Sequence, residues 1–321
     1  MPLLLTEAHV QQLLTMPEAM TAVEEAFARL GSGDGTATQP RGRFFLPHGV
    51  LHHMAGALPS KNVMGTKTYT SFGDTTRFYV QLFSSNTGEL LALIEGDHLG
   101  QIRTGAATGV AAKHLAREDA SKASLLGAGW QAEAQAEAIL VACPNIIEFQ
   151  VYSRHYVPRE RFCQKMTRKL NVRFTPMDSA EAAVRTTQII VCATTARDPI
   201  LFADWINPGD FIAAVGANRL TAREVDESVI EKATIVAVDD PVQARVEAAE
   251  LIFAYERRRL NWDSVVALSD IVSRTRPGRT SPQDITLFKS LGIALEDVAV
   301  GAAVYEKAKA QGIGIDIPST I

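Results

Sequence analysis

The sequence has few cysteines and no long apolar run, and both scarcities narrow its class. Only three cysteines occur among 321 residues. They have neither the even pairing of a disulfide framework nor the CxxC spacing of a zinc site, so we expect buried, reduced thiols. No apolar stretch approaches the roughly 20 residues of a membrane span, and no signal peptide is recognisable. We therefore expect a soluble, cytoplasmic protein that does not bind membranes.

A strong charge of either sign is also missing. The formal net charge is −4 and charged residues make up 21% of the chain, so nothing favours a nucleic-acid partner. No GxSxG motif or other nucleophile arrangement occurs. The adjacent His52 and His53 have no third histidine or carboxylate at metal spacing, so we expect no metal site.

What the sequence does contain is a glycine turn between a strand and a helix. An apolar run over residues 123–126 leads into Gly127-Ala-Gly-Trp-Gln-Ala132, and an Ala-rich segment follows up to Pro144. A second apolar run covers residues 149–152. The order strand, glycine turn, helix, strand is typical of the first βαβ unit of a dinucleotide-binding fold.

Each position of this turn has a physical role in such a fold. Gly127 can make the tight turn, and Gly129 lets the backbone approach a pyrophosphate at the helix N-terminus.

At the end of the second run, Ser153 and Arg154 replace the acidic residue that usually binds the ribose hydroxyls of NAD. Arg154 can pair with a 2′-phosphate, so we favour NADP over NAD, with NAD as the alternative.

The rest of the chain predicts two domains, because 321 residues exceed one ordinary core. Helical periodicity at residues 6–14 and 17–30 is followed by strand-like patterns from 39 to 94, which predict a mostly antiparallel sheet. Beyond Arg154, apolar runs alternate with helical segments, as in a parallel sheet with covering helices. Single helices are expected over residues 242–255 and 293–311. The fold class is thus α/β.

Four cations stand out by their context in the first half of the chain. Arg41 and Arg43 precede an apolar strand, and Lys67 lies inside a strand pattern. Arg103 opens a predicted helix made of Gly, Ala, Thr and Val. Tight packing there leaves a guanidinium in need of an anion, and a substrate carboxylate matches its geometry.

Two further segments end predicted strands of the parallel sheet: Cys192-Ala-Thr-Thr and Val215-Gly-Ala-Asn218. Ligands of open α/β sheets bind at the carboxyl ends of the strands. With these motifs and Gly100-Gln-Ile-Arg-Thr-Gly-Ala-Ala, Arg223-Glu-Val-Asp and Phe288-Lys-Ser-Leu-Gly, the chain resembles the ornithine cyclodeaminase/mu-crystallin family from end to end.

The resemblance implies a Rossmann NAD(P)-binding domain, residues 116–292, inserted in a smaller α+β domain for substrate binding and dimerisation, residues 1–115 plus 293–321. It also implies a homodimer. Lys67, Arg103 and Asn218 are the catalytic candidates. The substrate-binding candidates are Arg43, Arg41, His53 and Met54, with Arg43 preferred to Arg41 because of Pro47. Pattern and resemblance together give these cofactor contacts: Thr104, Gly127, Ala128, Gly129, Trp130, Gln131, Ser153, Arg154, Thr194, Thr195, Val215, Gly216, Lys289 and Ser290.

The chain departs from the cyclodeaminases of the family at Asn218, where they have an aspartate. Asparagine cannot accept a proton as a general base. We therefore predict an NAD(P)-dependent oxidoreductase acting on CH–NH or CH–NH2 groups, namely a reductase of a small imino acid or an amino acid dehydrogenase in reverse. Its substrate would be a ketimine, Δ1-pyrroline-2-carboxylate or iminosuccinate. The alternatives are an ornithine cyclodeaminase with recycled NAD and a non-enzymatic NADPH- and ligand-binding protein like mu-crystallin.

Overall fold

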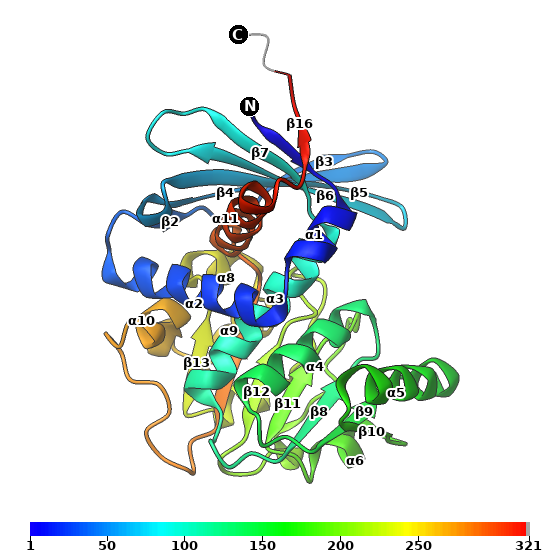
Figure 1. The fold of residues 1–321 in the computed structure, drawn as a ribbon. Coiled ribbons are helices and arrows are strands. Elements are labelled where there is room, and N and C mark those ends of the chain that lie inside the picture. The colour runs from blue at the N-terminus through cyan, green and yellow to red at the C-terminus, as the bar shows by residue number, and fades with distance from the viewer. Residues whose placement is uncertain (319–321) are drawn as a thin grey trace. The chain divides into compact units, whose positions relative to one another are not determined.

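A computed structural model describes residues 1–318 of the chain, which separates into two compact units (Figure 1). The discontinuous unit comprises residues 1–106 and the described residues from Gly292 onward, and the central unit comprises residues 107–291. The boundary between residues 106 and 107 falls inside helix α3 (Asp97–Leu115). Each unit has its own eight-stranded sheet, which confirms the α/β class.

The sheet of the discontinuous unit is built mainly of antiparallel hairpins, as the strand patterns predict. Its strand order is β16-β1-β7-β6-β5-β4-β2, with β3 also paired to β4, and only β1 and β7 are parallel. The strands are β1 (Leu3–Leu5), β2 (Ala37–Thr38), β3 (Gly42–Leu46), β4 (Gly49–Leu58), β5 (Val63–Phe72), β6 (Thr75–Ser84), β7 (Leu90–Glu95) and β16 (Ile315–Asp316).

Helices cover one face of this sheet. Besides the first part of α3, they are α1 (Glu7–Leu13), α2 (Met16–Ser32) and α11 (Ala294–Gln311), with a short 3-10 turn η1 (Pro59–Lys61). Helix α11 packs on β4, β5, β6 and α2 (Figure 1). In β5 the buried residues alternate with more exposed ones, so Val63, Lys67 and Tyr69 share the covered face. The C-terminal helix thus completes the core that the N-terminal strands begin.

The central unit has the parallel sheet of a Rossmann fold. Its strand order is β10-β9-β8-β11-β12-β15-β13-β14, and every pairing is parallel. The first five positions reproduce the doubly wound order 3-2-1-4-5, with the switch point beside β8, and β15 then lies between β12 and β13. The strands are β8 (Lys122–Leu126), β9 (Glu148–Tyr152), β10 (Arg173–Pro176), β11 (Ile189–Cys192), β12 (Phe211–Ala214), β13 (Ile235–Val238), β14 (Val265–Ala267) and β15 (Thr286–Lys289).

The helices of this unit are α4 (Trp130–Ala142), α5 (Tyr156–Leu170), α6 (Ala180–Val184), α7 (Glu227–Lys232), α8 (Pro241–Glu247), α9 (Ala249–Glu256) and α10 (Leu268–Val272), with 3-10 turns η2 (Ala203–Trp205) and η3 (Trp262–Ser264). The single helix expected over residues 242–255 is therefore wrong. The backbone leaves helical geometry at Ala248, with φ −78° and ψ 83°. Alanine is a strong helix former, so no local signal marks this break.

Candidate functional site

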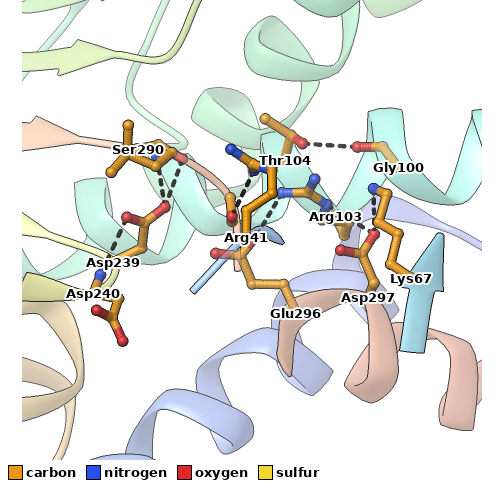
Figure 2. Close-up of polar contacts among 12 residues, drawn as sticks. Arg41, Lys67, Gly100, Arg103, Thr104, Asp239, Asp240, Ser290, Glu296 and Asp297 are labelled. Carbon is orange, nitrogen blue, oxygen red and sulfur yellow. Dashed lines mark hydrogen bonds and ion pairs between the residues drawn. The ribbon is translucent and has the colours of Figure 1, made fainter. Parts of the chain in front are cut away.

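Two of the four singled-out cations, Lys67 and Arg103, contact two carboxylates inside the discontinuous unit, and a third, Arg41, binds the backbone nearby. Lys67 Nζ donates a hydrogen bond to Asp297 Oδ1 at 2.7 Å, and Arg103 Nε donates to the same oxygen at 3.1 Å. Arg103 Nη1 donates to Glu296 Oε2 at 2.7 Å. Arg41 donates through Nη2 to the Gly292 carbonyl oxygen at 3.0 Å. Figure 2 shows Lys67 and Arg103 directed at Asp297.

This cation cluster, defined as Arg41, Lys67, Arg103, Glu296 and Asp297, is almost completely buried. The five residues are between 0% and 9% exposed. Three of them are cations and two are carboxylates. Guanidinium and ammonium groups that converge in a buried place suit an anion such as a carboxylate.

A pair of glycines brings the two carboxylates to this place. Gly56 and Gly65 lie opposite each other on β4 and β5. A Cβ on Gly56 would lie 3.0 Å from the Leu295 backbone nitrogen. A Cβ on Gly65 would collide with the Gln81 carbonyl oxygen on β6 and would lie 3.2 Å from Val298 Cγ2 on α11. The absence of side chains lets the first turn of α11 approach the sheet closely, which places Asp297 against Lys67.

The structure corrects the description of Arg103. Helix α3 begins at Asp97, so Arg103 lies in the second turn and does not open the helix. Its guanidinium already has two carboxylate partners from the chain itself, Glu296 and Asp297. Burial disfavours the charged form, but both carboxylates outweigh it and raise the pKa of Arg103. The arginine therefore stays charged at every accessible pH.

Lys67 titrates much nearer neutrality than an ordinary lysine. Burial, followed by the charge of Arg103, lowers the pKa of Lys67 to about 8, although Asp297 and its hydrogen bond oppose the shift. A pKa near the working pH is a property of groups that hold or move protons in catalysis.

Thr104, a candidate cofactor contact on the same helix as Arg103, donates a hydrogen bond from its hydroxyl to the Gly100 carbonyl at 2.7 Å.

The strand register places His52, and not the candidate His53, on the same face as Lys67. His52 pairs with Arg43 on β3 and with Tyr69 on β5, and Met54 pairs with Lys67. Residues two apart share a face, so His52 and Met54 lie on the Lys67 face while the exposed His53 does not.

His52 stacks on the Tyr69 ring, with 4.0 Å between centroids. Burial, then the charges of Arg43 and Arg41, lowers the pKa of His52 to about 4. The imidazole is therefore neutral at physiological pH.

Of the two arginines, Arg41 is 9% exposed and belongs to the cation cluster, whereas the preferred candidate Arg43 is half-buried on β3. The sequence ranking of Arg43 over Arg41 thus does not follow their burial.

In the central unit, the glycine turn has the geometry that a dinucleotide requires. Gly127 has φ +119°, and a Cβ there would collide with the Ala193 carbonyl. Gly129 is the N-cap of α4, and no atom lies within 4 Å of the place of its missing Cβ. This open space above the amides of a 13-residue helix fits a pyrophosphate. Beside it lie the half-buried Ala128 and Gln131 and the exposed Trp130.

Glu224, a residue of the Arg223-Glu-Val-Asp motif, ties together the ends of two neighbouring strands. Its Oε1 accepts hydrogen bonds from the Thr194 backbone at 2.6 Å and hydroxyl at 2.8 Å, and its Oε2 accepts from the Gly216 backbone at 2.6 Å. Burial raises the pKa of Glu224, against the effect of Lys289. The N–H groups of Thr194 and Gly216 and the Thr194 hydroxyl therefore bind Glu224 within the chain. Of the other two candidates after these strands, Thr195 is exposed and Val215 is half-buried.

Two of the candidate cofactor contacts are buried with internal partners. Lys289 is 1% exposed and donates to the Ala217 carbonyl at 2.5 Å and to Glu250 Oε1 at 3.2 Å. Ser290 donates to Asp239 Oδ2 at 3.3 Å (Figure 2). Both hold the strand ends in place, which their sequence motif alone did not reveal. Asn218, by contrast, is exposed after β12.

The segment after β9 exposes Arg154, the candidate for binding the 2′-phosphate of NADP. Arg154 is exposed and Ser153 half-buried. The neighbouring Arg159 is 5% exposed, donates to the Ser153 carbonyl at 2.9 Å and lies over the Tyr152 ring. Arg159, which the sequence did not single out, thus shapes the segment and leaves Arg154 accessible.

Residues 1–318 include neither a cluster of metal-ligating side chains nor a helix suited to span a membrane. No group of three or more His, Cys, Asp or Glu side chains in that range is arranged to hold a metal ion. Likewise, none of the helices described there combines the length and apolarity needed to cross a membrane.

Comparison with known proteins gives full-length similarity. The sequence model described as ornithine cyclodeaminase/mu-crystallin family matches residues 1–312. Alanine dehydrogenase of Archaeoglobus fulgidus is 33% identical over 323 residues, covering 98% of each chain.

Two solved structures superpose closely. The Δ1-pyrroline-2-carboxylate reductase of Thermococcus litoralis, in complex with NADH and L-proline, gives a TM-score of 0.93 at 31% identity and covers 98% of this chain and 100% of its own. An archaeal alanine dehydrogenase dimer with bound NAD gives 0.92 at 32% identity, with 99% of each chain covered.

Proposed function

Because the chain belongs to the ornithine cyclodeaminase/mu-crystallin family, we propose that it is an NAD(P)H-dependent reductase of a small imino acid, or an amino acid dehydrogenase in reverse. The observation that carries the proposal is the buried cation cluster, in which Lys67 and Arg103 converge on Asp297 and Arg41 binds the Gly292 carbonyl. The donor geometry of guanidinium groups matches an α-carboxylate. The similar Thermococcus litoralis protein is a reductase whose structure holds NADH and L-proline.

The cluster suggests how the chain would assist the reaction. Arg41 and Arg103 would bind the substrate carboxylate and fix the face of the imine that is reduced, which is mainly an entropic contribution. Lys67 would donate a hydrogen bond from Nζ and keep the imine protonated, since its pKa of about 8 lies close to neutrality. NAD(P)H, held at the glycine turn of Gly127 and Gly129, would supply the hydride that reduces the protonated imine to the amine.

Cofactor binding falls to the central unit in this proposal. The positive φ of Gly127 and the open N-cap at Gly129 fit a pyrophosphate, and the exposed Arg154 favours NADP over NAD. Homodimer formation is proposed as well, on the strength of the similar archaeal dimer.

The test is a substrate panel assayed with NADH and NADPH. Δ1-pyrroline-2-carboxylate, a piperideine-carboxylate, and pyruvate, glyoxylate and oxaloacetate with ammonia or methylamine cover the candidate imines. We expect one nicotinamide oxidised per amino acid formed. Lys67→Met should abolish turnover, whereas Lys61→Met, a matched change at a largely exposed lysine of the same unit, should not.

An absence of turnover across this panel would contradict the proposal. Ammonia release from L-ornithine without net oxidation of the cofactor would instead identify a cyclodeaminase. We expect no proline from ornithine, because Asn218 cannot serve as the base.

A further inference from the structure

One carboxylate in the cation cluster has no assigned role and lies against the candidate catalytic lysine. We propose that Asp297 is a positioning residue that keeps Lys67 protonated and oriented, an inference that rests on the proposed function for its catalytic consequence. Asp297 is 0% exposed and lies in the first turn of α11.

The geometry gives Asp297 a position that no other acid in the cluster has. Its Oδ1 accepts from both Lys67 Nζ at 2.7 Å and Arg103 Nε at 3.1 Å, so it fixes the distance between the two cations. Glu296, one residue earlier, bonds Arg103 through Oε2, and no bond from Glu296 to Lys67 is among those described.

Side chains from several elements face Lys67. Arg103 on α3 and Arg41, just before β3, disfavour the charged form of its ammonium, whereas Asp297 on α11 favours the charged form. The Phe78 ring of β6 lies 5.0 Å from Lys67 Nζ. Burial also disfavours the charged form. Among these groups Asp297 stabilises the ammonium, so its loss would lower the pKa of Lys67 further and favour the neutral amine.

Asp297→Asn is a sharp test because it removes the charge and keeps the shape. The asparagine oxygen can still accept from Lys67 and Arg103. Its amide nitrogen would replace Oδ2, which is buried without a hydrogen-bond partner among the described residues, so no existing bond is lost. An opposite charge at this range typically shifts a pKa by about 1–3 units.

The measurement is the titration of Lys67 in protein labelled with ¹³C and ¹⁵N at lysine, with the Lys67→Met spectrum assigning the resonance. We expect Asp297→Asn to lower the titration midpoint by at least about one unit. The alkaline limb of kcat/KM should move by the same amount, so activity above the limb falls about tenfold per unit. Glu296→Gln, the matched control from the same helical turn, should move the midpoint less.

The outcomes separate this inference from the proposed function. An unmoved midpoint in folded Asp297→Asn overturns the inference, whatever the activity. A shifted midpoint in a protein whose wild type reduces no imine supports the link between Asp297 and Lys67 and overturns the proposed function. If Asp297→Asn does not fold, Asp297→Glu replaces it. This variant keeps the charge at a changed distance, so the titration midpoint of Lys67 should stay near the wild-type value while kcat falls. A midpoint as low as expected for loss of the charge overturns the inference.

Discussion

At the scale of single residues, the chemistry of the site depends on which groups share a buried volume. Lys67 has an ordinary side chain, but burial and two arginines lower its pKa to about 8 while Asp297 holds the proton on it. His52 has no such acid beside it, and burial with Arg43 and Arg41 lowers its pKa to about 4. Neighbouring arginines, of which Arg41 acts on both groups, therefore leave the lysine near its titration point and the histidine neutral.

Arg103→Ala tests the ion pairs at this scale. The change leaves Glu296 and Asp297 buried without their guanidinium, and breaking a buried pair costs about 3–5 kcal/mol of unfolding free energy. It also removes a proposed substrate contact, so kcat/KM should fall at least about tenfold. Urea denaturation and steady-state kinetics measure the two effects. Arg117→Ala, at a more exposed ion pair with Asp119, should cost less than about 1 kcal/mol; equal losses in both variants would contradict the assignment.

Arg154→Ala tests cofactor selection. If the exposed Arg154 pairs with a 2′-phosphate, its loss should lower the NADPH to NADH ratio of kcat/KM by about tenfold, because a charge-assisted bond is worth roughly 1.5–3 kcal/mol. Arg161→Ala, an exposed arginine of α5, is the control and should leave the ratio unchanged. A wild-type preference for NADH would show that Arg154 does not read the phosphate.

At the scale of elements, the decisive contact is the close approach of α11 to β4 and β5. The helix carries Glu296 and Asp297 in its first turn, and the sheet carries Lys67 on the covered face. Gly56 and Gly65 allow the approach because a side chain at either position would reach the helix. The glycine pair is therefore a condition for the cation cluster.

Gly56→Ala should disturb this contact directly. The added methyl lies 3.0 Å from the Leu295 backbone nitrogen, and since backbone cannot rotate away, the first turn of α11 must shift. We expect a loss of about 1–3 kcal/mol in unfolding free energy and a lower kcat/KM. Gly42→Ala is the control, because its methyl meets the His53 carbonyl at an ordinary 3.7 Å. Wild-type stability and activity in Gly56→Ala would contradict this account.

At the scale of the whole molecule, the proposed homodimer requires a surface that can serve as its interface. One chain has a mass of 34.8 kDa, so a dimer has twice that, 69.6 kDa. The sheet of the discontinuous unit has a second face with Met64 and Tyr79 exposed by 37% and 41%. A hollow of about 360 Å³ beside it is lined by Ala55, Ala57, Met64 and Phe83, among others. Exposed apolar area of this kind suits a subunit interface.

Light scattering after size exclusion should therefore give about twice the chain mass. Met64→Arg introduces a charge into the apolar hollow and should shift the population towards monomer, because a buried unpaired charge opposes association. Val157→Arg, at an exposed apolar residue of α5, is the control and should leave the mass unchanged. A monomer in the wild type would exclude the dimer, and an unchanged mass in Met64→Arg would place the interface elsewhere.

The sequence by itself determined the parts of this protein that depend on near neighbours in the chain. The glycine turn at Gly127 and Gly129 identified the first Rossmann unit, because only glycine adopts the positive φ that position 127 has. Period-two patterns identified the antiparallel strands. The cations Lys67 and Arg103 could be singled out because charge is rare in apolar, small-residue segments.

Only the tertiary structure decided what those cations meet. Asp297 is 230 residues from Lys67, and Glu296 is 193 residues from Arg103. No local pattern relates such positions, because strand register and the packing of α11 on the glycine pair bring them together. The choice of His52 over His53 likewise depended on register, since a shift of one residue reverses the face of a strand. Burial then set the charge states, because the cost of an ion depends on which partners surround it.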